Sequence, residues 1–398
     1  MSRKRVVVLG STGSIGVQTL DIVRQRRDRL QVVGLACHRN GPALREQVRE
    51  FRPEAACLVD PNAAAQTRNQ MPSGVTLLAG QQGLSEIAAL PSADLVVGAV
   101  SGVAGLQSLL AALAAGKDVA LANKEPMVAA GRLVTDAAAR TGARLLPIDS
   151  ELSAIFQALQ GEDRRAIERV LLTASGGPFA KLDAAALREV TPEQALAHPT
   201  WRMGNKVTVD SATLANKGFE VFETKWLFGL DPSQIEVVVH HQSIIHSMVQ
   251  FVDGSIIAQM GLPDMRLPIQ YALFWPERVA NDLPRLELAE AATLTFGAPD
   301  FDRFPCLRLA YETVRKEGTT YPAVLNAANE VAVAAFLEGA IGFADIPHVS
   351  AAALEDHEPM SDEALDNVLA ADAWAREFAR RAVSHGAIRA GAEAGTSR

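Results

Sequence analysis

The first third of the chain alternates short apolar runs with segments of helical periodicity. The runs at residues 5–10 (RVVVLG) and 30–37 (LQVVGLAC) are rich in β-branched residues, which predicts buried parallel strands. Segments at 15–27 and 41–51 predict helices between strands. Strands alternating with helices form a parallel sheet covered on both faces, so we expect residues 1–149 to be a doubly wound α/β domain. Further strands are expected at 55–60, 95–100, 118–123 and 143–149, and further helices at 104–115 and 126–141.

The pattern changes after residue 150, where longer strand-like runs occur at 165–177 and 236–260. The turn signal VDGS at 252–255 indicates a hairpin within the second run. We therefore expect a second sheet that is largely antiparallel. Residues 263–305 contain six prolines and little periodicity, which is typical of a linker or of a segment that crosses between domains.

The last quarter of the chain is mostly helical in pattern, from about residue 306 to residue 385. Pro322 and Gly339 frame one helix in this region. The tail that follows is small and polar and is expected to fray. The predicted division is an α/β domain at 1–149, an α+β catalytic domain at 150–274, a linker at 275–304, a C-terminal helical bundle at 305–386 and a flexible tail at 387–398.

Composition and charge narrow the classes of partner. The 398 residues carry a net charge of −8, and 5% of them are aromatic. An acidic chain without a basic run or a set of aromatic stacking residues is a poor ligand for nucleic acid or an anionic membrane. The longest apolar tract, residues 94–116, is interrupted by glycines and polar residues, so no membrane span is expected. Three cysteines without metal or redox spacing are typical of a reducing compartment, and we expect a cytoplasmic protein.

Three glycines, Gly10, Gly13 and Gly16, follow the first strand and open the first helix. Glycines in this context let backbone amides approach a pyrophosphate, which favours a Rossmann-like dinucleotide site over an ordinary turn. The end of the second strand carries Cys37-His38-Arg39-Asn40 and no acid. A cation there favours the 2′-phosphate of NADP over the alternative, in which Arg39 is a solvated loop residue.

Two acids, Asp149 and Glu151, stand two positions apart at the end of an expected strand. In an extended segment they would point to the same side and favour a bound cation or a raised pKa. Ligands bind at the carboxyl ends of parallel strands, and Mg²⁺ or Mn²⁺ takes oxygen ligands. The alternative is that Asp149 caps a helix starting near Ser150 and Glu151 lies in its first turn, which would separate the acids. This pair alone does not decide between them.

A third candidate ligand lies in the stretch VTVDSATLANKGFEVFETKWLF, residues 207–228. If 211–226 is helical, Asn216, Lys217 and Glu220 share a face at spacings of three and four. The donors Ser211, Asn216 and Lys217 suit phosphate oxygens, and Glu220 is a possible metal ligand. An ordinary surface helix with a Lys–Glu pair is the alternative.

Three further stretches have the character of site loops. Ser175-Gly176-Gly177 can form an anion nest with its amides and hydroxyl. The loop AHPTWRMGNK at 197–206 carries Trp201 and Met203, which suggests a lid that excludes water, unless Trp201 is a core anchor. LANKEP at 121–126 ends a strand of the first domain beside the expected nicotinamide position.

Taken together and in order, these motifs resemble the 1-deoxy-D-xylulose 5-phosphate reductoisomerase family over roughly residues 5–335. The motifs are GSTGSIG, ANKEP, DSE, SGGPF, HPTWRMG, VDSATLANKGFE and GLPDMRLPIQYAL. The resemblance implies conversion of 1-deoxy-D-xylulose 5-phosphate to 2-C-methyl-D-erythritol 4-phosphate in the non-mevalonate isoprenoid pathway. It also implies NADPH, Mg²⁺ or Mn²⁺, inhibition by fosmidomycin, and a homodimer.

The resemblance assigns roles to individual residues of this chain. It implies that the catalytic residues include Lys124 and His198 together with the three metal ligands Asp149, Glu151 and Glu220. The residues implied to contact substrate, mostly through its phosphate or as a lid, are Lys124, Ser150, Glu151, Ser175, His198, Trp201, Met203, Ser211, Asn216, Lys217 and Glu220. The residues implied to contact NADPH are Thr12, Gly13, Ser14, Ile15, His38, Arg39, Asn40, Asn123, Glu125 and Gly204.

Three positions depart from the family pattern. Leu152 replaces a histidine after D-S-E, which removes a polar neighbour of the expected metal site. His241 replaces a proline in the sequence His240-His241-Gln242-Ser243, and His38 stands where small residues are common. Two other classes compete with the reductoisomerase. They are an NADP-dependent semialdehyde or homoserine-type dehydrogenase, and a non-catalytic NADP-binding regulator; neither requires three metal-binding acids.

Overall fold

A computed structural model of the chain describes residues 3–198, 201, 203–291 and 293–384. These residues form two compact units. Unit 1 comprises Met1–Pro126, Val134–Ser153 and Asp264–Pro284, and unit 2 comprises Met127–Leu133, Ala154–Pro263 and Arg285–Arg398. The tail predicted at 387–398 lies outside the described residues.

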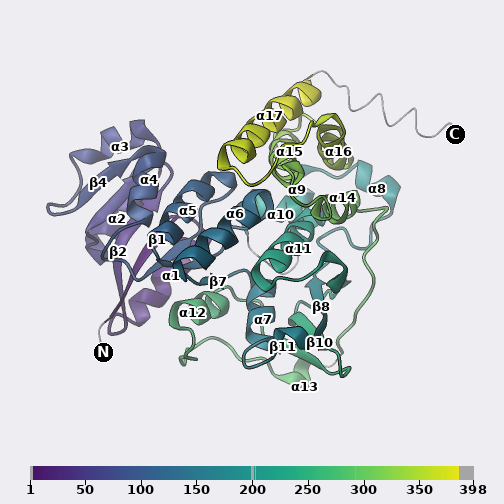
Figure 1. Cartoon of the computed structure of the whole chain (residues 1–398), viewed down its shortest axis with the longest axis horizontal. Coiled ribbons are helices and arrows are strands. Elements are labelled where there is room, and N and C mark those ends of the chain that lie inside the picture. Colours follow the sequence, from purple (N-terminus) through teal and green to yellow (C-terminus); the bar gives the residue numbers. More distant parts are fainter. Residues whose placement is uncertain (1–2, 199–200, 202, 292, 385–398) are drawn as a thin grey trace. The chain divides into compact units, whose positions relative to one another are not determined.

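Unit 1 is built on a parallel sheet, as predicted (Figure 1). The sheet has seven strands, one more than the sequence pattern predicted. Its strand order is β4-β3-β2-β1-β5-β6-β7, with all neighbours parallel. The direction of winding reverses at β1, and right-handed crossovers then place the helices of the two halves on opposite faces. The doubly wound prediction is confirmed. The strands are β1 (Lys4–Leu9), β2 (Leu30–Cys37), β3 (Ala55–Leu58), β4 (Thr76–Ala79), β5 (Leu95–Gly98), β6 (Asp118–Leu121) and β7 (Leu145–Pro147).

The helices of unit 1 pack as pairs against this sheet: α4 beside α5, and α1 beside α12. They are α1 (Ser14–Gln25), α2 (Gly41–Phe51), α3 (Pro61–Arg68), α4 (Gly80–Ala88), α5 (Leu106–Ala114), α12 (Arg266–Phe274) and most of α6 (Glu125–Thr141). A 3₁₀ turn, Val103–Gly105, precedes α5. The helix α6 has a non-helical residue, Ala130, in its middle part, which belongs to unit 2.

The interpretation of 263–305 as a linker is wrong over α12. Pro268 lies in the first turn of this helix, where the missing N–H has no helical partner to lose. Ile269 and Leu273 are fully buried in unit 1. Counting prolines without regard to their place in a helical turn therefore concealed a core helix. The elements α3, β4 and α4 were not predicted from the sequence.

Unit 2 contains a sheet of four strands in the order β11-β10-β8-β9. The strand β10 is antiparallel to β8 and to β11, whereas β8 and β9 are parallel. The predicted, largely antiparallel second sheet and its hairpin at 252–255 are therefore confirmed. The strands are β8 (Ile167–Ala174), β9 (Ile235–Val239), β10 (Ile245–Phe251) and β11 (Ile256–Met260).

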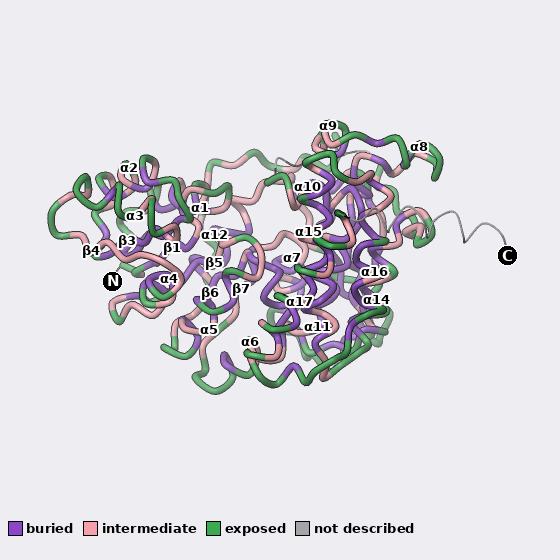
Figure 2. The backbone as a smooth tube through the Cα atoms, turned by 90° about the horizontal axis from the view of Figure 1, so that it is seen from above, coloured by how far each residue is buried: buried purple, intermediate pink, exposed green. Residues whose placement is uncertain are grey.

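The helices of unit 2 include a C-terminal group in which α15 packs against α16 and α17. Figure 2 shows α15 as largely buried, in agreement with its long row of buried residues. The helices are α7 (Ser150–Ala158, which begins in unit 1), α8 (Ala184–Arg188), α9 (Pro192–Ala195), α10 (Asn205–Ala212), α11 (Ala215–Phe228), α13 (Leu288–Ala291), α14 (Pro305–Val314), α15 (Tyr321–Leu337), α16 (Ile346–Asp356) and α17 (Leu365–Ser384). Short 3₁₀ turns lie at Arg164–Ala166, Pro232–Gln234 and Phe343–Asp345.

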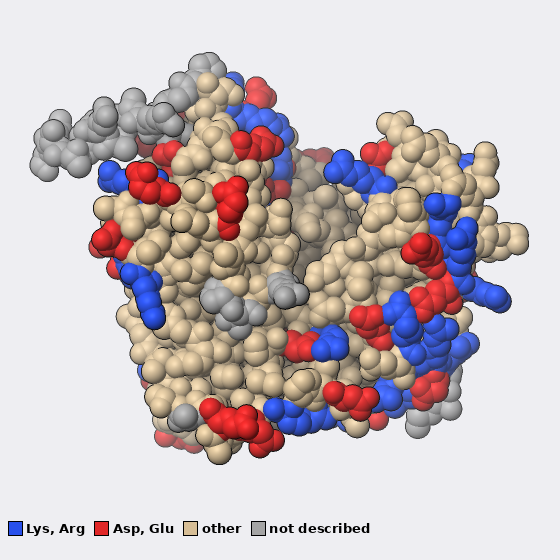
Figure 3. Space-filling view, turned by 180° about the vertical axis from the view of Figure 1, so that it is seen from behind, with Lys and Arg blue, Asp and Glu red and all other residues tan. Residues whose placement is uncertain are grey.

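The surface carries charges of both signs. On the face drawn in Figure 3, acidic and basic side chains lie next to one another. Among the described residues, none of the helices has both the length and the apolar character that crossing a membrane requires.

We expect Gly131→Ala to destabilise unit 2. A Cβ at Gly131 in α6 would lie 2.1 Å from Cδ1 of Trp226 in α11, so the indole would have to move. Overpacking of this kind costs about 1–3 kcal/mol of unfolding free energy. Urea unfolding monitored by tryptophan fluorescence measures this cost.

The matched control is Gly297→Ala, because a Cβ at Gly297 would have no heavy atom within 4 Å. Its effect should stay within about 0.5 kcal/mol. Equal unfolding free energies for the two variants would show that the contact with Trp226 is not tight.

Candidate active site

The loop after β1 is held in a strained turn by close backbone contacts. Gly10 has a φ of +81°, and a Cβ there would lie 2.2 Å from the carbonyl oxygen of Ala99. The N–H groups of Gly10 and Ser11 both donate to the carbonyl of Ala36 at 2.8 Å, which ties this loop to the end of β2. The turn leads directly into α1, whose first amides and dipole favour an anion.

All the residues predicted to contact NADPH except Gly204 lie at the carboxyl end of the sheet in unit 1. Thr12 and Gly13 are in the loop after β1, Ser14 and Ile15 begin α1, and His38 and Arg39 are exposed after β2. Asn40 has a structural use as well, because its Oδ1 accepts a hydrogen bond from the N–H of Ala43 at 3.2 Å and caps α2.

Asn123, Lys124 and Glu125 are buried where β6 leads into α6. Asn123 donates a hydrogen bond through Nδ2 to Oε2 of Glu125. Lys124 Nζ lies 2.7 Å from Oδ2 of Asp149. This ion pair joins the carboxyl ends of two neighbouring strands, β6 and β7, at one edge of the sheet.

The structure corrects the extended reading of Asp149 and Glu151. The helix α7 begins at Ser150, so Asp149 immediately precedes it and Glu151 lies in its first turn. The N–H of Ser153 donates to the Asp149 carbonyl at 2.8 Å, and Ser150 Oγ donates to Oε2 of Glu151. Helical placement does not separate the acids as expected, because each offers a carboxylate oxygen within 4.8 Å of the other.

The helix expected at 211–226 is interrupted at Leu214, which has a φ of +59° and separates α10 from α11. The predicted shared face survives, because it lies wholly in α11. Asn216 donates through Nδ2 to Oε1 of Glu220 at 2.6 Å, and Lys217 Nζ pairs with Oε2 of the same carboxylate. Glu220 is fully buried in unit 2 and is compensated there by a cation and an amide.

The proposed anion nest, Ser175-Gly176-Gly177, follows β8 directly. His198 Nδ1 accepts from the N–H of Trp201 at 2.9 Å, so in the neutral ring Nε2 carries the proton and donates to Ser175 Oγ at 3.2 Å. The same oxygen accepts from the N–H of Gly177 at 3.2 Å. Both acceptor positions of the Ser175 hydroxyl are thus used, and its own proton is left to donate to a ligand.

The remaining predicted residues of unit 2 lie around α10. Ser211 is half-buried near the end of α10, and Gly204 is exposed at its N-cap. Trp201 and Met203 are half-buried, and the Trp201 ring lies 6.0 Å from that of His246. A Cβ at Gly177 would lie 2.8 Å from the Ser211 carbonyl oxygen, so the anion nest packs closely on α10.

Some positioning residues were missed. Gln47 accepts a hydrogen bond from Ser11 Oγ at 2.7 Å and donates to the Ser11 carbonyl at 2.8 Å. Asp210, next to Ser211, pairs with Lys206 at 2.9 Å and accepts from Asn329 of α15 at 2.7 Å. No local pattern links Asn329 to Asp210, because their contact exists only in the folded chain.

Known proteins of one family match this chain along nearly its whole length. Models described as 1-deoxy-D-xylulose 5-phosphate reductoisomerase, its C-terminal domain and the DXP reductoisomerase C-terminal domain match residues 6–131, 145–228 and 260–378. The enzyme of this name from Heliobacterium modesticaldum is 53% identical over 386 residues, which are 96% of this chain and 98% of that protein. The chain belongs to the 1-deoxy-D-xylulose 5-phosphate reductoisomerase family.

Solved structures of this family have the same fold. The reductoisomerase from Zymomonas mobilis in complex with NADPH is 42% identical, with a TM-score of 0.90, over 96% of this chain and 99% of that one. A reductoisomerase in complex with NADPH, fosmidomycin and magnesium is 40% identical, with a TM-score of 0.91, over 96% and 98% of the two chains. The predicted family and fold class are therefore confirmed.

The three residues that depart from the family pattern differ in their burial and in their contacts. Leu152 is fully buried in the first turn of α7 and is part of the apolar core. His241 is exposed, but its Nδ1 bonds to the Ser175 carbonyl at 2.8 Å. His38 is exposed beside Arg39.

We expect stability to depend on pH through His198. Burial lowers the pKa of His198 below its ordinary value of 6.5, so the folded chain binds this proton less readily than the unfolded chain does. The stability contribution is therefore present above about pH 6.5 and is lost as the pH falls through the lowered value. Urea unfolding at about pH 7.5 and about pH 5.5 should show a larger loss for the wild type than for His198→Gln. Parallel losses would contradict this assignment.

Proposed function

We propose that this chain is a 1-deoxy-D-xylulose 5-phosphate reductoisomerase, in which Asp149, Glu151 and Glu220 hold one divalent ion. Its substrate is a phosphorylated sugar, which it rearranges and reduces with NADPH to 2-C-methyl-D-erythritol 4-phosphate. Membership of the family supports this activity, and two solved members are described in complex with NADPH, one of them with fosmidomycin and magnesium. The observation that carries the proposal is the set of three carboxylates, because the competing functions have no need of them.

The three acids fit a hard cation. Among the described residues they form a group that could hold one metal ion, and all their donor atoms are carboxylate oxygens. Mg²⁺ and Mn²⁺ prefer such ligands, whereas softer ions prefer sulfur or imidazole. When bound, the ion supplies Lewis-acid polarisation of vicinal oxygens of the sugar. We propose that Lys124 and Lys217, each paired with one of these acids, contact the substrate.

The phosphate end of the substrate is assigned to unit 2. Lys217 supplies a cation, Asn216 and Ser211 supply neutral donors, and the Ser175 hydroxyl retains one proton to donate. His198 holds the Ser175 hydroxyl in this orientation. Trp201 and Met203 form the lid and exclude water from the reacting groups.

The cofactor is assigned to unit 1. The turn at Gly10 and the start of α1 hold the pyrophosphate, and Arg39 pairs with the 2′-phosphate of NADPH. Ser150 lies between the two acids, on the substrate side. Asn123 and Glu125 contact the nicotinamide half, together with Gly204. We accordingly propose that residues 1–149 bind NADPH, residues 150–274 carry the metal and substrate groups, and residues 305–386 support them.

The cysteines argue against a dehydrogenase that uses a thiol nucleophile. Cys37, Cys57 and Cys306 are free and buried. Burial raises the pKa of Cys37 to about 11 and those of Cys57 and Cys306 to about 12. All three are therefore thiols at neutral pH and poor nucleophiles. Free thiols also support the proposal that the enzyme acts in the cytoplasm.

We expect Glu220→Gln to abolish turnover while leaving NADPH affinity close to that of the wild type. The amide is a weaker ligand for a divalent ion and leaves Lys217 without its charge partner. Loss of a partner outside the ligand shell costs about 10–100-fold, so loss of a ligand should reduce kcat/KM by about 100-fold or more. NADPH oxidation with 1-deoxy-D-xylulose 5-phosphate and Mg²⁺ measures turnover, and fluorescence titration measures NADPH binding.

The control is Glu236→Gln, the same exchange at an exposed carboxylate paired with Arg169. Its turnover should match that of the wild type. A chelator should stop the wild-type reaction, and added Mg²⁺ should restore it. Undiminished turnover by Glu220→Gln would remove this residue from the ligand set.

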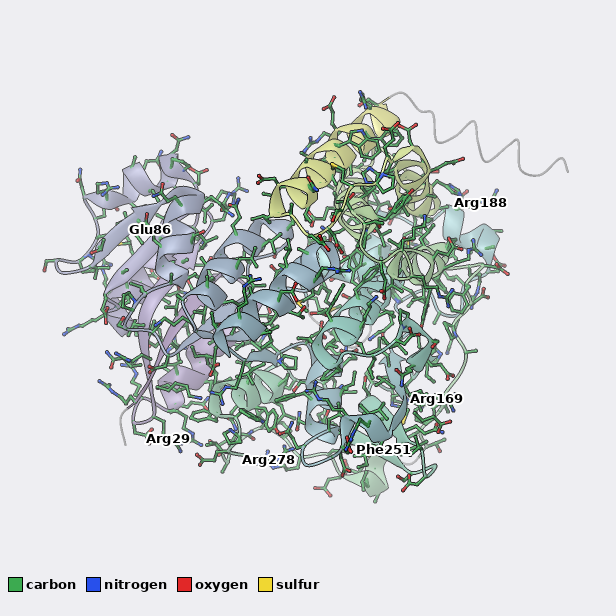
Figure 4. All side chains as sticks on the ribbon, viewed as in Figure 1. Arg29, Glu86, Arg169, Arg188, Phe251 and Arg278 are labelled. Carbon is green, nitrogen blue, oxygen red and sulfur yellow. The ribbon has the colours of Figure 1, made fainter. Side chains whose placement is uncertain are left out.

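We also propose that the chain forms a homodimer through the edge strand β11 of unit 2. Ile256 and Ile257 on this strand are 51% and 38% exposed, and Val252 in the preceding turn is 69% exposed. An uncovered apolar edge strand invites pairing with another strand, and self-association would cover it. In Figure 4 the labels Arg169 on β8 and Phe251 on β10 mark the two inner strands of this sheet, and β11 is the edge strand next to β10.

We expect Ile256→Lys to shift the chain from dimer to monomer, because a charge would be buried without a partner. Sedimentation velocity at several concentrations measures the association. Val17→Lys is the control, since Val17 is 44% exposed on α1 of unit 1. A wild type that sediments as a monomer, or a variant that stays dimeric, would contradict the proposed interface.

A further inference from the structure

Ser175 is hydrogen-bonded to neighbouring residues through its backbone carbonyl as well as through its hydroxyl. The Ser175 carbonyl accepts a hydrogen bond from Nδ1 of His241 at 2.8 Å. Because a carbonyl oxygen can only accept, Nδ1 of His241 carries a proton. The function proposed above uses the Ser175 hydroxyl and leaves this second contact without a role.

The His241 ring also lies close to Gly176, the residue that follows Ser175. Gly176 has a φ of +84°, and a Cβ there would lie 3.1 Å from Cε1 of His241. Gly177 continues the turn with a φ of +66° and donates its N–H to Ser175 Oγ. The ring thus contacts the loop at the two residues that determine where its amides and its hydroxyl point.

His241 is itself held in place by the turn to which it belongs. His240 is fully buried, with Nδ1 2.9 Å from the Thr295 carbonyl. Its Nε2 accepts from the N–H groups of Ile244 and Ile245, both at 3.2 Å. The turn after β9 is therefore closed by a buried side chain, and His241 projects from a fixed backbone onto the neighbouring strand end.

We propose that His241 is a positioning residue for anion binding, which acts through the Ser175 backbone to aim the loop at a phosphate or phosphonate group. The inference rests on the proposed function in assigning that phosphate to the sugar substrate. A proline, which the family pattern has at this position, offers no such N–H donor. Phosphate affinity in this chain therefore depends on a contact that a proline at this position would not supply.

The test compares three variants of the full chain: His241→Ala, His241→Asn and Gln242→Ala. Asparagine places an N–H donor two bonds from Cβ, as Nδ1 of histidine does. Gln242 is the matched control, because it lies in the same turn and its Nε2 donates to the Thr293 carbonyl at 3.3 Å and to Thr295 Oγ1 at 2.9 Å rather than to the loop. Steady-state kinetics give KM and kcat, and calorimetry with inorganic phosphate gives a dissociation constant that does not depend on turnover.

For His241→Ala we expect KM for 1-deoxy-D-xylulose 5-phosphate and Kd for inorganic phosphate to rise together, by about threefold to tenfold. The values of kcat and of KM for NADPH should not change, since the contact orients a binding group. His241→Asn should restore most of the affinity, and Gln242→Ala should behave as the wild type.

Unchanged phosphate affinity in His241→Ala would overturn the inference, and so would equal effects of His241→Ala and Gln242→Ala. The proposed function fails separately. Suppose that the wild type binds phosphate, that His241→Ala binds it more weakly and that His241→Asn restores the affinity, but that the wild type does not turn over the sugar phosphate. This result would refute the reductoisomerase activity and support the positioning role of His241.

Discussion

A carboxylate can be buried only if a cation or several donors lie beside it, and this constraint applies to the candidate site residues of each unit. Glu220 is fully buried and faces Lys217 and Asn216 of its own helix. Asp149 is nearly buried and faces Lys124. Each acid is thus paired with a lysine. A carboxylate is also the kind of ligand that a divalent ion prefers, so the ion pairs that permit burial suit the metal site proposed above.

Rigid elements hold these side chains. Nearly every residue of α11 is buried, and Gly218 allows α14 to approach so closely that a Cβ there would lie 2.5 Å from the Cβ of Ala310. The position of Glu220 is consequently fixed by packing on both sides of its helix. Asp149 and Glu151 are fixed in another way, because Asp149 lies between the end of β7 and the start of α7, and Glu151 lies in the first turn of α7. A site for a hard cation needs such support, since loosely held ligands lose affinity.

Patterns that are local in the chain were read correctly from the sequence, and contacts that arise only on folding were not. The spacing of three and four residues among Asn216, Lys217 and Glu220 placed them on one helical face, and the structure has them hydrogen-bonded. The break at Leu214 was missed because a leucine with positive φ has no signature in the sequence. A helix that begins between Asp149 and Glu151 was one of the two alternatives left open, but the expectation that it would separate the two acids is wrong.

The two glycine loops that we propose to bind anions are stabilised in different ways. The loop at Gly10 leads within four residues into α1, and this helix fixes the loop and adds its dipole. The loop at Gly176 is followed by no helix until α8, which begins at Ala184 and has five residues. A short and distant helix contributes neither rigidity nor field to an anion. Side chains must hold this loop instead of a helix. His198 is hydrogen-bonded to the Ser175 hydroxyl, and His241 is hydrogen-bonded to the Ser175 carbonyl. The departure of this chain from the family pattern at His241 therefore lies where the fold itself gives the least support.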